Sequence, residues 1–545
     1  MLGLMQDHPL LISSLIEFAE RHHGEGEVVS RRVEGDLHRY TYTDVARRAR
    51  QAANALDAMQ LGFGDRVATL AWNGYRHLEL YFGVSGSGRV LHTLNPRLHP
   101  EQIAWIVNHA QDSVLCFDMS FLPLIQAVHA KCPTVKTWVA LCDADKLPEG
   151  SGIPNLVSYE AWIGGASDQY VWPQFDENSA AGLCYTSGTT GNPKGALYSH
   201  RSTVLHAYGG ALPDAMNLSA RDSMMPVVPM FHVNAWGLPY GAALTGCKLV
   251  FPGPAMDGKS LYELMEAEGV TMAAGVPTIW QMLLAHVQGG KLKFSTLTRT
   301  VIGGSACPPA MIDTFREDFG VDVLHAWGMT ETSPLGSVST LKNKHLKLPA
   351  AQQMAIRVKQ GRAICGVDMR IVGDDGQEQP WDGKTYGDLQ VRGPWVMASY
   401  FKGQSPLVTD QNGVRWFPTG DVATIDADGY MQITDRSKDV IKSGGEWISS
   451  IDIENIAMAH PAIAMAACIG MPHPKWDERP IVAVVTKPGA EVTREELLKF
   501  YEGRTAKWQI PDDVVFVEAI PLGATGKMLK TKLRELLKDY KLPTS

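Results

Sequence analysis

The chain has 545 residues and a mass of 59.6 kDa, more than one hydrophobic core usually organises, so its length predicts at least two domains. Its formal net charge is −8 and its lysines and arginines are not clustered, which excludes a nucleic acid or an anionic membrane bound through bulk electrostatics. The eight cysteines form neither a C-x-x-C pair nor a zinc-ligand spacing, so they indicate buried reduced thiols, a cytoplasmic protein and no structural metal.

Apolar runs alternate with amphipathic helical patterns before about residue 360. The first apolar run, residues 10–16, lacks the basic leader and the cleavage site of an export signal. The alternation predicts an α/β fold with largely parallel sheets in a sandwich-like N-terminal domain. The strands predicted in this part are residues 66–72, 135–142, 248–251, 300–302 and 321–324, and the helices are residues 101–109 and 261–268.

Residues 223–247 contain no Asp, Glu, Lys or Arg, which invites a test for a membrane span. Pro226, Pro229 and Pro239 would break a spanning helix and leave backbone polar groups in lipid. We therefore predict no membrane span here. The segment is interpreted as a buried strand and loop that line an apolar pocket.

The pattern changes after about residue 360, where turn signals at residues 374–376 and 426–429 separate alternating segments. They predict a β-rich subdomain. Residues 435–449 are then rich in charge and glycine, and a compact α+β pattern follows. We predict a boundary near Asp435 that divides the chain into residues 1–434 and a small C-terminal domain of residues 435–545.

The segment YTSGTTGNPKG, residues 185–195, directly follows a predicted strand and has the composition of a phosphate-binding loop. Glycines let backbone N–H groups approach an anion, hydroxyls add donors and a lysine adds one positive charge. The Walker pattern G-x-x-x-x-G-K-[ST] is absent, so a P-loop fold is disfavoured. The residues expected to meet the phosphates are Thr186, Ser187, Gly188, Thr189, Thr190, Gly191 and Lys194.

Three further strings carry chemistry that fits a magnesium nucleotide. In HAWGMTETSP, residues 325–334, the Glu331 carboxylate can hold Mg²⁺ against a triphosphate. In WFPTGDVATID, residues 416–426, Asp421 can accept hydrogen bonds from both ribose hydroxyls. In GGSACP, residues 303–308, a glycine turn after a strand lets a flat base lie close to the backbone.

Together these strings resemble the signature motifs of the AMP-forming acyl-CoA synthetases, a superfamily that includes luciferases and peptide-synthetase adenylation domains. The resemblance extends from Ser13 to the KLREL string at Lys532, and it is most specific to medium- and long-chain fatty-acyl-CoA ligases and 3-methylmercaptopropionyl-CoA ligases. It implies that a carboxylate attacks the α-phosphate of Mg-ATP to give an acyl-adenylate and pyrophosphate, and that coenzyme A then takes the acyl group. Homodimers occur in that superfamily, so a homodimer is also an expectation.

The resemblance also implies roles for individual residues. Catalytic roles fall to Lys527, which neutralises charge on the α-phosphate during adenylation, to Glu331 and to His232, and the metal ligands are Thr186 and Glu331. Asp435 is the implied hinge about which a mobile C-terminal domain rotates. The implied contacts of coenzyme A are Gly444, Gly445 and Glu446. The implied nucleotide contacts beyond the phosphate loop are Gly304, Ser305, Ala306, His325, Ala326, Trp327, Thr330, Asp421, Arg436, Lys438, Lys442 and Trp447.

The string VPMFHVNAWG, residues 228–237, carries the implied acid site. His232 would lie beside the carboxylate, Val233 and Gly303 would line the acyl pocket, and Trp236 would either gate a tunnel or pack in the core. The uncharged surroundings predict an apolar tail, either of a medium-chain fatty acid or of 3-(methylthio)propanoate. Two alternatives stay open, an enzyme that loads its adenylate onto a carrier protein and a non-catalytic sensor of acyl nucleotides.

Overall fold

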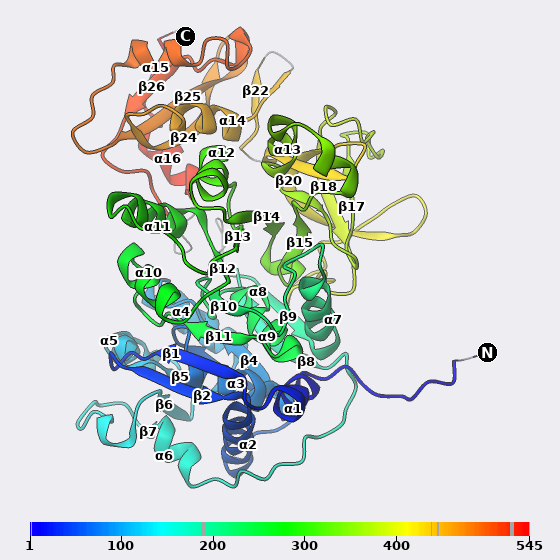
Figure 1. Ribbon diagram of the computed structural model, residues 1–545, viewed down its shortest axis with the longest axis vertical. Coiled ribbons are helices and arrows are strands. Elements are labelled where there is room, and N and C mark those ends of the chain that lie inside the picture. The colour runs from blue at the N-terminus through cyan, green and yellow to red at the C-terminus, as the bar shows by residue number, and fades with distance from the viewer. Residues whose placement is uncertain (2, 187–191, 438, 444–445, 524–527, 544–545) are drawn as a thin grey trace.

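A computed structural model describes residues 1, 3–186, 192–437, 439–443, 446–523 and 528–543, and for Glu446 and Trp447 it describes the backbone alone. Three sheets and the helices around them follow one another along the molecule, from the N-terminal part at the bottom of Figure 1 to the C-terminal domain at the top. Strands alternate with helices through most of this length. The predicted α/β fold class is confirmed.

The first sheet has the strand order β7-β6-β5-β3-β4-β8-β9 and is parallel except for the last pair. Its strands are β3 (Arg66–Leu70), β4 (Val90–Thr93), β5 (Asp112–Phe117), β6 (Thr137–Ala140), β7 (Leu156–Ser158), β8 (Ala180–Tyr185) and β9 (Gly195–Ser199). The helices of this region are α2 (Tyr42–Ala58), α3 (Tyr75–Gly86), α4 (Pro100–Ala110), α5 (Leu122–Val128) and α6 (Tyr159–Gly164). The predicted phosphate loop joins the antiparallel strands β8 and β9, not a strand and a helix, as expected for a loop that is not a P-loop.

The second sheet combines a parallel half and an antiparallel half that meet at β14. The parallel half, edged by the antiparallel β2, contains β1 (Glu27–Arg31), β2 (Leu37–Thr41), β10 (Ser223–Pro226), β11 (Lys248–Phe251), β12 (Met272–Gly275), β13 (Arg299–Ile302) and β14 (Asp322–Gly328). The antiparallel half contains β15 (Leu335–Val338), β16 (Gly361–Ala363), β17 (Asp368–Val372), β18 (Gly387–Arg392), β19 (Val408–Thr409), β20 (Arg415–Ile425) and β21 (Tyr430–Arg436). The β-rich part thus begins before residue 360, at β15.

The helices around the second sheet are α1 (Ile12–His23), α7 (His200–Ala211), α9 (Leu238–Thr245), α10 (Gly258–Ala267), α11 (Pro277–Gly289), α12 (Pro309–Asp313) and α13 (Ala350–Arg357). One buried apolar cluster runs from β3 and β4 through α2, α3 and α9 to β11 and β12, so helices lie between the two sheets and share one core with them. This arrangement agrees with the predicted sandwich of α/β sheets.

The uncharged segment 223–247 differs from its prediction as strand and loop. Only β10 is a strand, a short turn labelled α8 (Val233–Trp236) follows, and residues 238–245 form the buried helix α9. Pro239 lies in the first turn of α9, where a missing N–H breaks no intrahelical bond. A helix that is apolar on all sides is a core helix in a globular protein. Among the described residues, no helix combines the length and the apolar character needed to span a bilayer.

The C-terminal domain is built on the third sheet, with the order β23-β22-β25-β24 and β26 beside β25. Its strands are β22 (Ile441–Ser443), β23 (Glu446–Ile448), β24 (Ile463–His473), β25 (Asp477–Thr486) and β26 (Asp513–Phe516). Its helices are α14 (Ser450–Met458), α15 (Arg494–Phe500) and α16 (Lys530–Leu536). Buried apolar clusters of its own fill this domain.

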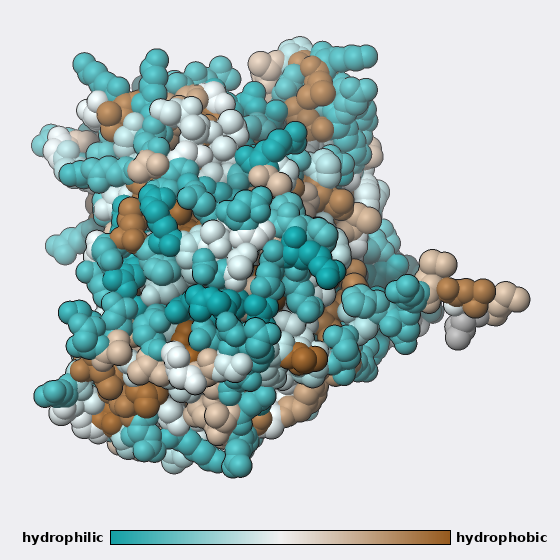
Figure 2. Space-filling model, turned by 60° about the horizontal axis from the view of Figure 1, so that its bottom comes forward, coloured by the Kyte–Doolittle hydropathy of each residue, from teal (hydrophilic) through white to brown (hydrophobic). Residues whose placement is uncertain are grey.

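The surface offers few large apolar areas on the side seen in Figure 2, which is mainly hydrophilic with small separate apolar patches. The segment before α1 projects from the body of the molecule (Figures 1 and 2) and exposes Met1 and Met5. Seven of the eight cysteines are buried, and Cys365 is exposed.

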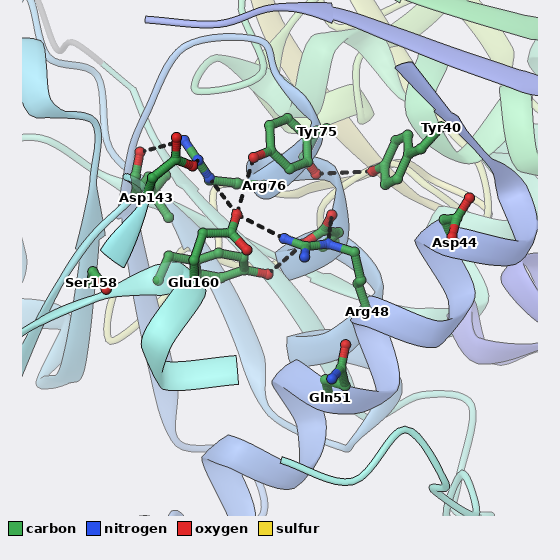
Figure 3. Close-up of polar contacts among 12 residues, drawn as sticks. Tyr40, Asp44, Arg48, Gln51, Tyr75, Arg76, Asp143, Ser158 and Glu160 are labelled. Atoms are coloured by element: carbon green, nitrogen blue, oxygen red, sulfur yellow. Dashed lines mark hydrogen bonds and ion pairs between the residues drawn. The ribbon is translucent and has the colours of Figure 1, made fainter. Parts of the chain in front are cut away.

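A polar network fastens the helices of the first sheet to one another, away from any predicted site (Figure 3). Arg48 of α2 bonds Glu79 of α3 at 2.7 Å and Glu160 of α6 at 2.9 Å, and Arg76 of α3 bonds Glu160 at 2.8 Å. Burial would raise the pKa of Glu160, but the hydrogen bonds and charges of Arg48 and Arg76 outweigh burial and lower that pKa. The network therefore has a structural role, because it ties α2, α3 and α6 to one another.

Candidate active site

A cavity of about 380 Å³ lies between the second sheet and the C-terminal domain. Its size is in the range of small-molecule sites. Many residues predicted from the sequence share it. Those that line it are Thr186, His232, Val233, Trp236, Gly303, Gly304, Ala326, Trp327, Thr330, Glu331 and Arg436.

The topology explains why residues so far apart in the chain meet here. Thr186 follows β8, His232 follows β10, Gly303 follows β13 and Thr330 follows β14. Each of these strands runs parallel to neighbours in its sheet, so each loop leaves a carboxyl end. The crevice outside the carboxyl ends of parallel strands is where open α/β sheets bind their ligands.

Partners from two other segments, residues 397–400 and β9, hold Glu331 and the preceding Thr330 at the cavity. Oε1 of Glu331 accepts a hydrogen bond from the Tyr400 hydroxyl at 2.8 Å, and the Glu331 carbonyl accepts one from the Met397 N–H at 2.8 Å. The preceding carbonyl, of Thr330, accepts a bond from the Tyr198 hydroxyl at 2.7 Å. Burial and the Glu331 charge raise the pKa of Tyr400, which therefore remains a donor. Tyr400 orients the carboxylate.

The oxygen atoms that the cavity offers fit a magnesium ion that is bound mainly by the phosphates of a nucleotide. The Glu331 carboxylate and the Thr186 hydroxyl are the hard oxygen ligands that Mg²⁺ prefers. Among the described residues, no group of three His, Cys, Asp or Glu side chains is arranged to hold a metal. The protein part of the cavity thus offers one or two oxygen ligands, as is usual where phosphate and water oxygens supply the rest.

The phosphate loop closes at its base by a hydrogen bond from the Thr186 N–H to the Lys194 carbonyl at 2.8 Å. The Lys194 ammonium lies 5.0 Å from the centre of the Tyr400 ring, the ring that orients Glu331. Several predicted residues lie outside the described parts of the chain. They are Ser187, Gly188, Thr189, Thr190, Gly191, Lys438, Gly444, Gly445 and Lys527, together with the side chains of Glu446 and Trp447.

The glycine turn after β13 forms a tight wall of the cavity. A Cβ at Gly303 would lie 3.0 Å from the Ala326 carbonyl oxygen and 3.2 Å from Cη2 of Trp236. Gly304 has φ +82°, in the left-handed region that favours glycine. These two glycines line the cavity, as predicted, whereas Ser305 and Ala306 do not contribute to its described lining.

His325 supports this turn from behind and does not line the cavity. Its Nε2 accepts a hydrogen bond from the Cys307 N–H at 3.2 Å, and its Nδ1 bonds the Val358 carbonyl at 3.0 Å. One acceptor and one donor nitrogen require the neutral ring. Burial lowers the pKa of His325 to about 4, so the ring is neutral at physiological pH. The described cavity lining does not include His325, and its implied nucleotide contact stays a prediction.

Asp421 lies inside β20, not at a strand start, and its carboxylate faces Trp327 and Arg436. Trp327 Nε1 donates to Oδ2 at 3.0 Å, and Arg436 Nε lies 3.0 Å from Oδ1. Asp421 and Arg436 are paired across β20 and β21. Trp327 and Arg436 line the cavity and Asp421 lies just behind them. Lys442 lies on β22, away from the cavity lining, and its N–H donates to Glu478 at 3.0 Å.

Sequence reasoning missed the residues that complete the site from other segments. Tyr400 follows no recognisable motif, so nothing in the sequence linked it to Glu331. Asp439, Gly523, Met528 and Leu529 line the cavity from the C-terminal domain. Met528 and Leu529 directly follow Lys527 in the sequence, and this position could have predicted that they line the cavity.

Comparisons with known proteins agree with this geometry. The family model for AMP-binding enzymes matches residues 16–401, and the model for the AMP-binding enzyme C-terminal domain matches residues 452–527. The chain is 55% identical to a 3-methylmercaptopropionyl-CoA ligase of Ruegeria lacuscaerulensis, over 99% of both chains. It is 52% identical to a medium-chain-fatty-acid–CoA ligase of Ectopseudomonas oleovorans, over 100% of this chain and 99% of that one.

Solved structures show the same fold. ATP-bound MatB from Rhodopseudomonas palustris superimposes with a TM-score of 0.82 at 26% identity, covering 98% of this chain and 100% of that chain. The anthranilate CoA ligase AuaEII in complex with anthranoyl-AMP gives a TM-score of 0.84 at 24% identity, covering 98% and 99%. The loops at the carboxyl ends of β8, β10, β13 and β14 thus surround one cavity in a chain that belongs to the AMP-binding enzyme family.

Proposed function

We propose that this protein is an ATP-dependent, AMP-forming acyl-CoA ligase that activates a carboxylic acid with an apolar tail. The family match and the CoA ligases at 52–55% identity support the acid–thiol ligase class. The single structural observation that carries the proposal is the shared cavity, in which Glu331, the glycine wall and the apolar residues Val233 and Trp236 meet.

In the first step, a substrate carboxylate oxygen bonds to the α-phosphorus of ATP while the bond to pyrophosphate breaks. Glu331, oriented by Tyr400, and Thr186 would hold Mg²⁺, which when bound neutralises charge on the phosphates. The bare backbone of Gly304 would admit the base, and Arg436 would contact the ribose or a phosphate. His232 would lie beside the reacting carboxylate, and Lys527 would offset negative charge on the α-phosphate.

In the second step, the sulfur of coenzyme A attacks the acyl carbonyl and AMP leaves. Neither step needs a nucleophilic side chain, because the protein contributes position and charge. We assign the path of coenzyme A to Gly444, Gly445 and Glu446, and the rotation between the two steps to a hinge near Asp435 that separates residues 1–434 from residues 435–545.

The acid is proposed to be 3-(methylthio)propanoate or a medium-chain fatty acid. Val233, Trp236 and Leu335 contribute apolar groups to the cavity lining, and such groups suit a tail without charge. Relatives of 55% and 52% identity bear the names of ligases for these two acids. The free, mostly buried cysteines favour a cytoplasmic location, and a homodimer stays part of the proposal.

The decisive experiment measures pyrophosphate, AMP and thioester formation with a panel of C3 to C16 acids and 3-(methylthio)propanoate, with and without coenzyme A. We expect AMP and pyrophosphate with every accepted acid, and a thioester only when coenzyme A is present. Production of ADP, or no consumption of ATP with any acid, would overturn the proposal. Adenylate formation without a thioester would instead indicate an enzyme that loads a carrier protein.

A further inference from the structure

The wall of the cavity beside the acid is made from a backbone segment in an uncommon conformation. Five consecutive residues are left-handed, with φ of +47° at Val233, +51° at Asn234, +49° at Ala235, +58° at Trp236 and +73° at Gly237. Of these five, only the last is a glycine. For other L-residues this conformation is unfavourable, because the Cβ comes too close to the following carbonyl oxygen. Such backbone persists only where its surroundings over-determine it, and it concentrates at functional sites.

The Asn73 side chain forms three hydrogen bonds with the loop that enters this left-handed turn. Its Nδ2 donates to the Pro226 carbonyl at 2.7 Å and to the Val228 carbonyl at 2.9 Å, and its Oδ1 accepts from the Met230 N–H at 2.6 Å. Asn73 is 1% exposed, so water does not replace these bonds. Both N–H groups and the oxygen of the Asn73 amide thus form hydrogen bonds with the same loop, residues 226–230.

A second side chain, Tyr81, bonds the loop three positions before the left-handed turn begins at Val233. The Tyr81 hydroxyl, on α3, donates to the Met230 carbonyl at 2.6 Å. Asn73 lies just before Gly74, the N-cap of α3, so both groups belong to the short segment of residues 73–81. Met230 is therefore bonded through both its N–H and its carbonyl, and His232 follows it by two residues.

The exit of the turn is confined as well. A Cβ at Gly237 would lie 2.7 Å from Nδ1 of His206, and Nε2 of the same ring accepts a hydrogen bond from the Leu335 N–H at 3.1 Å. Leu335 lines the cavity. Between entry and exit, the Trp236 ring lies against Gly303. The position of this ring therefore depends on the backbone conformation that both ends impose.

We propose that Asn73 is a positioning residue for acid recognition: by clamping residues 226–230 it imposes the left-handed turn that presents His232, Val233 and Trp236 to the acid. This inference rests on the proposed function, because it assigns the acid to that end of the cavity. Asn73 itself does not line the cavity and acts through the loop. Its loss should alter recognition of the acid and leave recognition of ATP nearly unchanged.

The test compares Asn73→Ala with Asn54→Ala in the full-length protein. Asn54 is a matched control because its Nδ2 also donates to two distant backbone carbonyls, of Ser167 at 2.7 Å and of Gln169 at 2.9 Å, far from the cavity. ATP–pyrophosphate exchange is measured against 3-(methylthio)propanoate, butanoate, octanoate and dodecanoate. For Asn73→Ala we expect the KM for the acid to rise by about tenfold and the preference among acids to flatten, with the KM for ATP within about twofold of wild type. Asn54→Ala should change none of these.

A rescue variant separates this role from a loss of stability. Glycine lowers the cost of left-handed backbone, so Ala235→Gly added to Asn73→Ala should recover part of the affinity for the acid. If Asn73→Ala does not fold, Tyr81→Phe removes one hydroxyl from the same clamp and is read in the same way, with a smaller rise in the KM for the acid.

Unchanged acid KM and acid preference in Asn73→Ala, or equal losses for ATP and for the acid, would overturn the role of Asn73. Failure of the proposed function looks different, because the wild-type protein would then show no exchange with any acid.

Discussion

At the scale of single residues, the site depends on side chains that touch no ligand but orient those that would. Tyr400 is the clearest case, because it donates to Glu331 across 69 positions of sequence and lies beneath the Lys194 ammonium. A group that orients a metal-binding carboxylate affects metal affinity nearly as strongly as the ligand does. The motif around Glu331 predicted the carboxylate but not the hydroxyl that aims it.

Removal of that hydroxyl gives the first prediction. Tyr400→Phe keeps the ring near Lys194 and deletes the bond to Glu331, so we expect the Mg²⁺ concentration for half-maximal pyrophosphate exchange to rise by roughly tenfold. Titration of MgCl₂ at fixed total ATP measures it. Tyr208→Phe, at a half-exposed tyrosine on α7, is the control. An unchanged Mg²⁺ requirement in Tyr400→Phe would disprove the orienting role.

The second prediction concerns Lys527, whose role is inferred from the resemblance and which lies outside the described residues. Since its charge is needed only while the α-phosphate is attacked, Lys527→Ala should abolish adenylate formation and spare thioester formation from supplied acyl-adenylate. Separate assays of the two half-reactions check this. Comparable losses in both would contradict the assignment.

At the scale of elements, α16 is fastened to the start of α14 next to the proposed hinge. The Lys530 ammonium lies 2.7 Å from Oε1 of Glu454 and bonds the Ser450 hydroxyl, and the Ser450 N–H donates to Asp435 at 2.7 Å. Burial would lower the pKa of Lys530, but Glu454 and Asp435 outweigh burial and raise it, so Lys530 stays charged. This contact fixes the helix that directly follows the cavity residues Met528 and Leu529.

Breaking that contact gives the third prediction. Lys530→Met leaves Glu454 buried without its partner, so we expect the C-terminal domain to lose about 3 kcal/mol of stability and adenylation to fall more than thioester formation. Differential scanning calorimetry and the two half-reaction assays measure these effects. Lys530→Arg, which keeps the charge, should be milder, and Lys532→Met, at an exposed lysine of α16, should be neutral. Loss of stability equal to that of Lys532→Met would refute the contact's importance.

At the scale of the whole molecule, buried titratable groups act in opposite directions as the pH falls. Burial lowers the pKa of His77 to about 4, and its ring bonds the Thr69 hydroxyl at 2.9 Å and the Trp72 carbonyl at 3.1 Å. Close by, burial raises the pKa of Asp118 to about 7. A histidine with a depressed pKa stabilises the fold above its unfolded pKa of 6.5, and this contribution is lost as pH falls toward 4. The raised pKa of Asp118 changes the free energy of unfolding in the opposite direction. The pH dependence of the wild type alone therefore does not separate the two groups.

The fourth prediction therefore compares variants. The free energy of unfolding of the wild type, relative to His77→Gln, should be lower at pH 5 than at pH 7.5 by about 2 kcal/mol, because the unfolded wild type takes up a proton that the folded state resists. Urea denaturation of both proteins at the two pH values measures the difference. A difference independent of pH would show that His77 is not held neutral in the fold.

Several helices and strands show which parts of the fold could be predicted from the sequence. The strand predicted at residues 248–251 and the helix at residues 101–109 were correct to within a residue, since periodicity and Pro100 at the helix start are local signals. The interpretation of residues 238–245 as loop was wrong, because an apolar stretch buried on all sides has no periodicity that separates helix from strand. The left-handed turn before it had no sequence signal, since four of its five residues are not glycine.

The sequence by itself determined the chemistry of this protein. Glycines, hydroxyls, a lysine and a carboxylate in fixed local order specify how a nucleotide can be handled, because backbone access and ligand type are properties of short segments. Only the tertiary structure decided which groups support that chemistry. Asn73 reaches a loop 153 to 157 positions away, and Tyr400 reaches Glu331 from the loop between β18 and β19. Such contacts arise from packing and topology, and local spacing carries no information about them.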